Sequence, residues 1–411
     1  MNSWQVAHQC PQCGAPVTLE ETDRLFACPY CRVRLYLAAA GPCHYYIPPS
    51  HSHQGEIFYV PYWRLKGISF AARAEQIDHR LLDTSLPAFS CSALPQSLGF
   101  RPQALSLLFA TPELPGSWLA VQKSLSTVVS DLTAGRLPGG LPAGEYAAFI
   151  GEVSSLIYAP IGQSADGFRD AIDGTILTGM TAAEGILQHS ESRGPSWQHS
   201  FVPALCPACG WDLEGDRESL VLLCSHCDTA WTASPAGLRS MAWGVSPTVA
   251  KGELLQVPFW RLEVAVDGLE LTSYADLIRQ ANIPKVAAPA WNERRLCFWL
   301  PAFKIRPQLF LRLARQMTIK QIVDEPERRV GSRRFYPVTL PLAEALESLT
   351  VLLATMIMPK KRIFPLLPHL KITLQDAVLI FQPFAAQGQD FVAPSGGGAV
   401  HRNAFRWGRQ L

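Results

Sequence analysis

Eight of the eleven cysteines stand in four Cys-x-x-Cys pairs, and this spacing is the strongest chemical signal in the chain. The pairs form two arrays, with 14 residues between the pairs of each array. Four thiolates favour tetrahedral Zn²⁺, and a shell without an open position is structural, not hydrolytic. We therefore expect two structural Zn²⁺ ions per chain. The predicted ligands are Cys10, Cys13, Cys28 and Cys31 in the first array, and Cys206, Cys209, Cys224 and Cys227 in the second.

Redox chemistry, iron binding and a histidine ligand each fit the cysteine pairs less well than a four-thiolate zinc shell. A redox-active Cys-x-x-Cys motif is single and opens a helix in a βαβ pattern, whereas here a double pair occurs twice. Iron in an all-thiolate shell remains the alternative to zinc, although the 14-residue gap is shorter than we expect for iron. His226 lies between Cys224 and Cys227 and competes as a ligand, but the spacing favours Cys227.

Both arrays resemble zinc ribbons of the form Cys-Pro-x-Cys-Gly followed by a second Cys-x-x-Cys turn. The first turns read Cys-Pro-Gln-Cys-Gly at 10–14 and Cys-Pro-Ala-Cys-Gly at 206–210. Glycine follows neither second turn. The resemblance to the zinc-ribbon superfamily implies Zn²⁺ ligation by the eight cysteines and a three-stranded ribbon in each segment. It covers two segments of roughly 30 residues and implies no function, because similar ribbons occur in transcription factors, helicases, ribosomal proteins and interaction adaptors.

The sequence after each array recurs, which predicts an internal duplication. Val-Pro-Tyr-Trp-Arg-Leu at 60–65 matches Val-Pro-Phe-Trp-Arg-Leu at 257–262. A period of roughly 200 residues is too long for a solenoid repeat and indicates a duplicated two-part domain. Weaker matches follow in the same order, and they pair 94–95 with 300–301, 101–103 with 306–308, 123–126 with 347–350, and 156–160 with 379–383.

The elements that must position these arrays are rich in strands. The 411 residues suffice for two to three domains, and 33 prolines and 29 glycines favour turns and strands over a helical bundle. We predict an α+β, β-rich fold in which each half is a small four-cysteine ribbon followed by a larger mixed domain with at least one helix. Strands are predicted at 56–70, 147–159, 253–271 and 371–384, and helices at 119–132 and 342–358. The predicted parts are zinc ribbon 1 (1–36), body 1 (37–188), a linker (189–200), zinc ribbon 2 (201–235) and body 2 (236–411).

The two halves of the chain carry net charges of opposite sign. Residues 1–199 carry 12 basic and 16 acidic side chains, whereas residues 200–411 carry 24 and 18. Much of the excess lies at 304–334, where nine basic residues face three acidic ones. The segment is either a solvated face or a surface for an anionic partner such as nucleic acid, lipid or an acidic protein. The candidate residues for this surface are Arg328, Arg329, Arg333, Arg334, Lys360, Lys361 and Arg362.

The sequence contains no established catalytic motif. It lacks a phosphate-binding GxxxxGK[ST], a GxGxxG, an HExxH and a GxSxG. Cys43 and His44 with the histidines at 51 and 53 are a weak candidate for a third metal site, and Asp78, His79 and Asp83 a weak acid–base candidate. The repeated Trp63 and Trp260 either pack in the cores or form an exposed patch for a partner. We predict no enzyme, with an unrecognised active site as the alternative.

The function favoured by these observations is a non-catalytic, zinc-binding adaptor or assembly subunit that binds protein partners. The alternative is a nucleic-acid-binding factor that uses the basic residues of the second half, with the four arginines at 328, 329, 333 and 334 on phosphates. We expect no transmembrane segment, because the most apolar stretch is about half the length that a bilayer requires. The odd number of cysteines and the absence of a recognisable signal peptide predict a cytoplasmic location.

Overall fold

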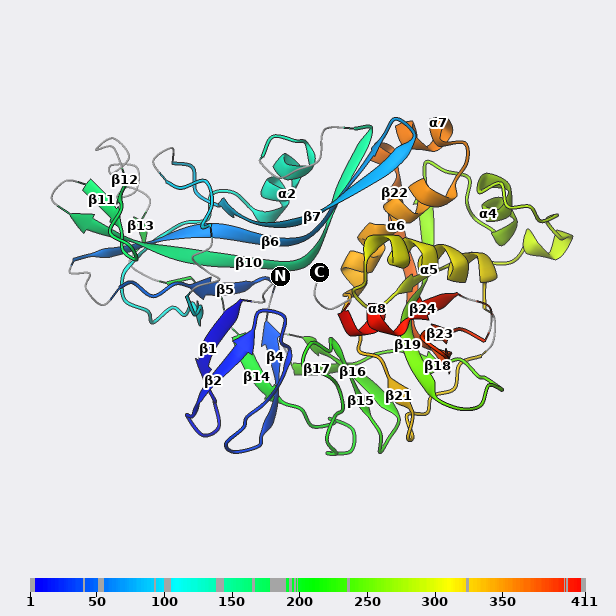
Figure 1. Ribbon diagram of the computed structural model, residues 1–411, viewed down its shortest axis with the longest axis horizontal. Helices are drawn as coiled ribbons and strands as arrows, with labels where there is room; N and C mark the ends of the chain where they lie inside the picture. Colours follow the sequence, from blue (N-terminus) through cyan, green and yellow to red (C-terminus); the bar gives the residue numbers. More distant parts are fainter. Residues whose placement is uncertain are drawn as a thin grey trace.

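The computed structural model is β-rich, with two large sheets and few helices. Figure 1 shows the sheets side by side, with the cysteine-bearing segments below them. None of the described helices is both long and apolar enough to cross a membrane. The structure describes residues 4–39, 41–50, 55–91, 94–99, 105–137, 144–164, 167–177, 190–191, 194–195, 197, 199–234, 237–322, 325–394, 396 and 398–407.

The first array lies in cysteine module 1, defined here as residues 4–39. β1 and β2 form a two-stranded sheet, and β3 and β4 form a second hairpin. The ends of these hairpins carry the two Cys-x-x-Cys turns. The strands are β1 (Gln5–Gln9), β2 (Pro16–Glu20), β3 (Leu25–Ala27) and β4 (Arg34–Ala39).

The first large sheet has nine strands within the described residues. β6 and β10 are long antiparallel strands at its centre, and β5 pairs parallel to β10. β-Branched and aromatic residues suit these half-buried surfaces. The strands are β5 (Cys43–Tyr46), β6 (Ile57–Arg73), β7 (Gln76–Pro87), β8 (Leu108–Phe109), β9 (Ser117–Leu119), β10 (Tyr146–Ser164), β11 (Gly167–Asp170), β12 (Ile176–Leu177) and β13 (Ser190–Glu191).

One helix, α2 (Leu125–Thr133), packs on this sheet. Ser124 caps its N-terminus, because the hydroxyl accepts a hydrogen bond from the Thr127 amide. The helix predicted at 119–132 therefore begins later than expected, and Leu119 belongs to β9. The apolar spacing correctly predicted a helix in this segment. The first predicted residue pairs in a strand instead, and the serine cap sets where the helix begins.

Cysteine module 2, defined here as residues 199–240, holds the second array. β15, β16 and β17 form its three-stranded sheet, as expected. Module 1 differs from that expectation, because β14 of module 2 completes the β3–β4 sheet by pairing with β4. The strands are β14 (His199–Pro203), β15 (Val221–Cys224), β16 (Thr229–Ser234) and β17 (Gly237–Ser240).

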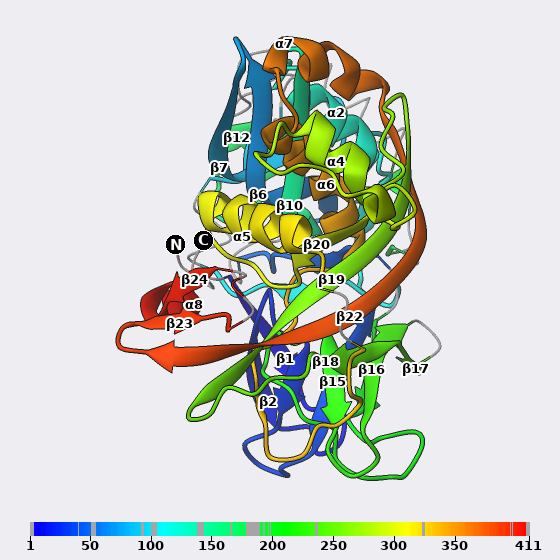
Figure 2. The ribbon, with the colours of Figure 1, turned by 90° about the vertical axis from the view of Figure 1, so that its right-hand side faces the viewer.

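The second large sheet has seven strands within the described residues and carries most of the helices. Figure 2 shows its long strands β19 and β22 crossing the molecule side by side. Its strands are β18 (Trp243–Val245), β19 (Leu254–Asp267), β20 (Cys297–Pro301), β21 (Arg334–Phe335), β22 (Lys371–Gln387), β23 (Asp390–Val392) and β24 (Ala399–His401).

Helices cover this sheet and share its hydrophobic core. Ser273 and Asp276 form a capping box at the start of α4, and Pro307 opens α5. The α-helices are α4 (Tyr274–Gln280), α5 (Pro307–Lys320), α6 (Leu342–Met356), α7 (Lys360–Ile363) and α8 (Arg402–Trp407), and the 3₁₀ helices are η1 (Pro289–Trp291) and η2 (Phe364–His369). The helix predicted at 342–358 is α6.

The central strands of the two sheets pair in matching register. Trp63 lies opposite Leu156 in the first sheet, and Trp260 lies opposite Leu379 in the second. Both tryptophans are buried, which confirms the expectation that they pack in the cores. β5 runs parallel to β10 as β18 runs parallel to β22.

Strand pairing aligns different residues from two of the predicted sequence matches. Leu-Pro at 86–87, not 94–95, lies beside β6 as Leu-Pro at 300–301 lies beside β19. The next residues agree as well, because the amide of Ala88 donates to the Pro61 carbonyl and that of Ala302 to the Pro258 carbonyl, each at 2.9 Å. The full match is Leu-Pro-Ala-Phe at 86–89 and 300–303.

The match for Lys123 also changes. The indole N–H of Trp63 donates to the Lys123 carbonyl at 2.7 Å, and that of Trp260 donates to the Leu340 carbonyl at 3.0 Å. Lys123 therefore corresponds in position to Leu340, not to Glu347. The resemblance of Lys-Ser-Leu-Ser to Glu-Ser-Leu-Thr arose from helix composition, which is a weaker constraint than a buried hydrogen bond.

Candidate metal centres

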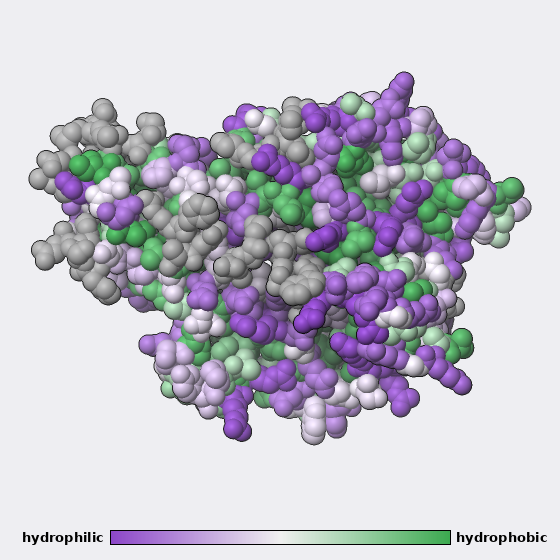
Figure 3. Space-filling model, in the orientation of Figure 1, coloured by the Kyte–Doolittle hydropathy of each residue, from purple (hydrophilic) through white to green (hydrophobic). Residues whose placement is uncertain are grey.

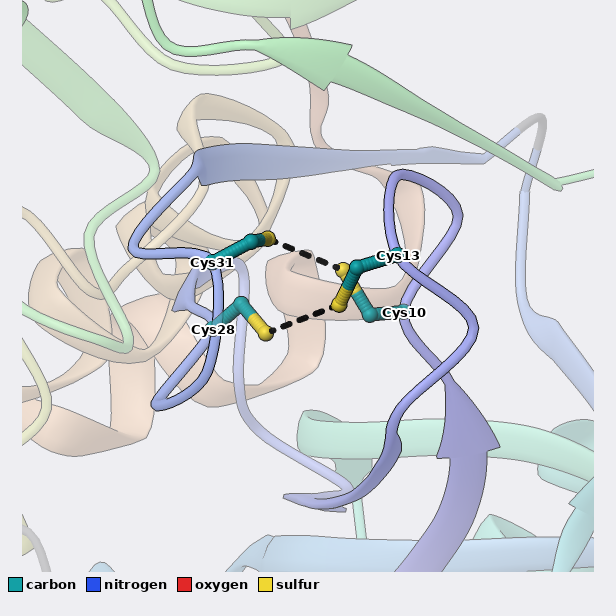
Figure 4. A group of neighbouring side chains, drawn as sticks. All are labelled: Cys10, Cys13, Cys28 and Cys31. Atoms are coloured by element: carbon teal, nitrogen blue, oxygen red, sulfur yellow. Dashed lines mark hydrogen bonds between the residues drawn. The ribbon is translucent and has the colours of Figure 1, made fainter.

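The four cysteines of module 1 converge from two facing turns (Figure 4). The Sγ atoms of Cys10 and Cys31 are 3.8 Å apart, and those of Cys13 and Cys28 are 3.7 Å apart. All four sulfurs lie within 4.8 Å of one another. Cys10 and Cys28 are buried, whereas Cys13 and Cys31 are exposed, so the cluster lies at the module surface with one side covered.

Module 2 repeats this arrangement with slightly shorter distances. The Sγ atoms of Cys206 and Cys227 are 3.5 Å apart, as are those of Cys209 and Cys224. The four sulfurs again lie within 4.8 Å of one another. Cys227 is therefore part of the cluster as predicted, and His226 instead stacks on the exposed ring of Trp211.

These distances fit a tetrahedral ion. A zinc–sulfur bond of about 2.3 Å places the corners of a regular tetrahedron about 3.8 Å apart. The two closest sulfur pairs of each cluster are at or just below that separation, and all four sulfurs lie within 4.8 Å of one another, so an ion requires little movement of the turns. A four-thiolate shell selects zinc or iron among common metals and has no open position for a substrate. The geometry of each cluster suits the binding of a metal ion by four thiolates.

The backbone of each turn explains how two sulfurs reach one side. The residue after the second cysteine takes a left-handed conformation in all four turns, at Gly14, Arg32, Gly210 and Asp228. In the first turn of module 1 the Gly14 amide donates a hydrogen bond to the Cys10 carbonyl at 2.8 Å. The amides of Arg32 and Gly210 donate in the same way to the first cysteine of their own turns. Glycine tolerates this conformation best. Arg32 and Asp228 adopt it without glycine.

The surroundings shift the pKa values of the thiols in opposite directions. Desolvation raises the pKa of Cys28, but hydrogen bonds from backbone amides and neighbouring thiols outweigh it and lower that pKa to about 6. Cys206 behaves in the same way, with a pKa lowered to about 6. Desolvation and nearby thiols raise the pKa of Cys224 to about 12. Each cluster thus favours a first thiolate and resists further ones until a cation neutralises them.

Sequence reasoning missed a hydroxyl beside the second cluster. Thr229 Oγ1 lies 3.1 Å from Cys227 Sγ and 3.6 Å from Cys206 Sγ. The indole N–H of Trp231 donates to the same oxygen at 2.8 Å, which leaves the threonine proton free to point at sulfur. Such a donor fixes the orientation of the ligands and stabilises their charge. Its position two residues after the last cysteine was the available signal.

The described members of the weaker catalytic and metal candidates do not assemble into a site. Asp83 pairs with Arg64, and Asp78 pairs with Arg73 at 2.9 Å. His44 stacks on Trp197. The histidines at 51 and 53 lie outside the described residues. Among the residues that the structure describes, the two cysteine clusters are the only groups with metal-ligand spacing.

The structure separates the candidate basic residues into two places. Arg328, Arg329, Arg333 and Arg334 lie in and before β21, whereas Lys360, Lys361 and Arg362 lie on α7 at the opposite end of the seven-stranded sheet (Figure 1). Figure 3 shows hydrophilic residues over much of this half of the molecule, with hydrophobic residues in small separate groups. The seven cations therefore do not form one patch.

Several of these cations already have partners. Arg333 pairs with Glu327 and Arg334 with Glu253, each at 3.1 Å. The ammonium of Lys360 donates to three carbonyls at the end of α6 and closes that helix. Arg328 and Arg329 are exposed, and no carboxylate of the described part of the chain lies within 4.0 Å of either guanidinium.

Comparison with known proteins identified no relative: no family model, no curated protein and no solved structure matches this chain.

Proposed function

We propose that the chain is a non-catalytic zinc protein of the zinc-ribbon type that acts as a protein-interaction adaptor or assembly subunit. The observation that carries the proposal is the pair of four-thiolate clusters with tetrahedral spacing. Their position supports a structural role, because the two modules share a sheet and a core. Closed thiolate shells stabilise small modules that present surfaces to partners.

The proposal includes descent by internal duplication, with the part boundaries predicted from the sequence. Matching register around Trp63 and Trp260 supports it, as do the equal hydrogen bonds at Ala88 and Ala302. Common descent explains why two metal modules occur in one chain and why each adjoins a sheet with the same central pairing. A cytoplasmic location is part of the proposal, and the eleven free cysteines support a reducing compartment.

Capture of a specific partner tests this function. The tagged, zinc-loaded chain is purified from its source cells, partners are identified by mass spectrometry, and binding is rebuilt with purified partner by size-exclusion chromatography. We expect a stable complex that Cys206→Ser/Cys209→Ser weakens and Cys91→Ser leaves unchanged. Catalytic turnover that is lost on changing a residue outside the modules, without a partner complex, would contradict the proposal.

A nucleic-acid-binding factor is the second candidate, and the exposed guanidinium groups of Arg328 and Arg329 favour it. Phosphate contacts make binding steeply dependent on salt. A filter-binding titration with duplex DNA and single-stranded RNA at two salt concentrations checks it. Retention that falls with salt and with Arg328→Gln/Arg329→Gln supports the candidate, whereas no retention at low salt refutes it.

A further inference from the structure

Module 2 exposes a large aromatic ring beside its metal centre. Trp211 follows the first Cys-x-x-Cys-Gly turn, and 56% of its surface is accessible. Leu205 precedes the same turn and is 47% exposed. Burial of such side chains is favourable, and tryptophan is enriched where proteins bind one another. The metal turn itself requires neither residue.

A stacked partner orients the tryptophan. The ring of His226 lies 5.1 Å from that of Trp211, centroid to centroid, with 20° between the planes. The two residues come from the two opposed turns of one metal cluster, so the metal that joins the turns also fixes this stack. A ring held in this way loses little conformational entropy when a partner covers it.

Two exposed carboxylates belong to the segments that carry the stack. Asp212 lies next to Trp211 in sequence and opposite Leu205 in an isolated β-bridge, and its side chain is exposed. Glu214 is exposed as well and accepts a hydrogen bond from the Ser225 hydroxyl at 2.6 Å. The one Lys or Arg in residues 201–235 is Arg217, which pairs with Asp23 of module 1. The face is therefore aromatic and acidic.

Module 1 provides a comparison, because the same turns there carry other residues. Ala15 stands where Trp211 stands, and Arg32 stands where Asp228 stands. Tyr30 is exposed at the tip of module 1, but the neighbouring charges are the basic Arg32 and Arg34. The aromatic, acidic face belongs to module 2 alone, so metal binding does not account for it.

We propose that Trp211, His226 and Leu205, with the carboxylates of Asp212 and Glu214, form the docking surface for a basic segment of a partner protein. An arginine or lysine side chain lies over the Trp211 ring, where a cation–π contact is strongest, and pairs with the carboxylates. The inference rests on the proposed function, since it names the chemistry of the partner that the adaptor binds.

Fluorescence anisotropy with a labelled peptide tests the surface. The probe is a fluorescein-labelled (Arg-Gly-Ser)₄ peptide, and the matched peptide carries glutamine in place of arginine. We expect the zinc-loaded full chain to bind the arginine peptide more tightly, with affinity that falls as salt rises. Trp211→Ala should weaken binding about tenfold or more, and Asp212→Asn/Glu214→Gln should weaken it and flatten the salt dependence.

Tyr30→Ala is the matched control, because it removes an exposed aromatic ring from a cysteine turn of module 1. It should leave peptide affinity unchanged, and the zinc content of each variant confirms that its turns are intact. Equal binding of the arginine and glutamine peptides, or unchanged binding by Trp211→Ala, would overturn the inference. If an identified partner still forms its complex with Trp211→Ala, the docking surface is wrong while the adaptor function stands.

Discussion

Arg64 is a fully buried cation at the joint between module 1 and the nine-stranded sheet. Its guanidinium pairs with Asp83 of β7 and with Glu21 of module 1, and it lies 3.9 Å from the ring centroid of Trp4. A charge without water depends on such partners, since removing one leaves the other uncompensated. Arg261, at the corresponding position of β19 in the second sheet, is only half-buried.

This contrast predicts unequal effects of one substitution. Arg64→Met should lower the free energy of unfolding by about 3 kcal/mol, because it removes a buried cation that pairs with both Glu21 and Asp83. Arg261→Met is the control and should change stability by less than about 1 kcal/mol. Urea denaturation of the zinc-loaded chain measures both. An equal loss of unfolding free energy in the two variants would show that the ion pairs of Arg64 do not stabilise the contact between module 1 and the sheet.

Thr229 predicts a difference between the two metal centres. Thr229→Val keeps the shape of the side chain but removes the hydroxyl near Cys206 and Cys227. We expect the zinc affinity of the second centre to fall about tenfold, as for other groups that orient metal ligands. Competition with a chromophoric chelator measures it. Thr18→Val, on an exposed position of β2, should have no effect, and equal affinities for both variants would contradict the role.

At the scale of elements, β14 joins the two modules. It pairs with β4, and the Tyr36 hydroxyl of module 1 donates to the Ser219 carbonyl of module 2 at 3.0 Å. Leu25 and Tyr36 share a hydrophobic cluster with Leu222 and Trp231. Metal-driven folding of one module therefore stabilises the surface on which the other packs.

The shared core predicts that the two metal centres are coupled. Cys10→Ser/Cys13→Ser should remove the first ion and also weaken zinc binding at the intact second centre. Native mass spectrometry during a zinc titration resolves the one-ion and two-ion species. Cys91→Ser is the control for cysteine loss outside the clusters. A second centre with unchanged affinity in the double variant would mean that the modules fold independently.

β14 also brings His199 into an aromatic cluster with His8 of β1 and Phe109 of β8. Burial lowers the pKa of His199 to about 4, with a smaller contribution from His8, and burial alone lowers the pKa of His44 to about 4. The unfolded chain, with histidine pKa values near 6.5, therefore binds more protons than the folded chain between these values. Stability should fall as pH drops from about 6.5 to about 4.

Histidine variants distinguish this pH dependence of stability from the loss of metal in acid. His44→Phe/His199→Phe should reduce the fall in stability between pH 6.5 and 5, because two of the depressed histidines are gone. Phe168→Leu on β11 is the control for altered aromatic packing and should retain the wild-type slope. Urea midpoints across this range measure the slopes. Parallel curves for all three proteins would refute the contribution of the cluster.

At the scale of the whole molecule, the sequence predicted what depends on local spacing. The cysteine sets follow from turns of four residues, and β6, β10, β19 and β22 follow from runs of β-branched and aromatic residues. Pairings between distant segments carry no such local pattern. Because of this, the sequence could not predict the buried ion pair of Arg64 with Glu21 or the pairing of β14 with β4 of module 1.

A dipeptide that occurs twice explains why the sequence alone predicted a different match between the two halves. Leu-Pro occurs at 86–87 and again at 94–95, and only strand pairing distinguishes the copy that matches 300–301. The basic residues at 328–334 and 360–362 are close in sequence but lie at opposite ends of the seven-stranded sheet. Sequence proximity predicted one surface where the fold makes two.

The metal content of the purified chain tests the central claim most directly. Inductively coupled plasma mass spectrometry of protein prepared without added metal should give two zinc ions per chain, and Cys206→Ser/Cys209→Ser should lower that number by at least one. Iron in place of zinc, or a chain that is folded and metal-free with eight reactive thiols in the clusters, would contradict the account.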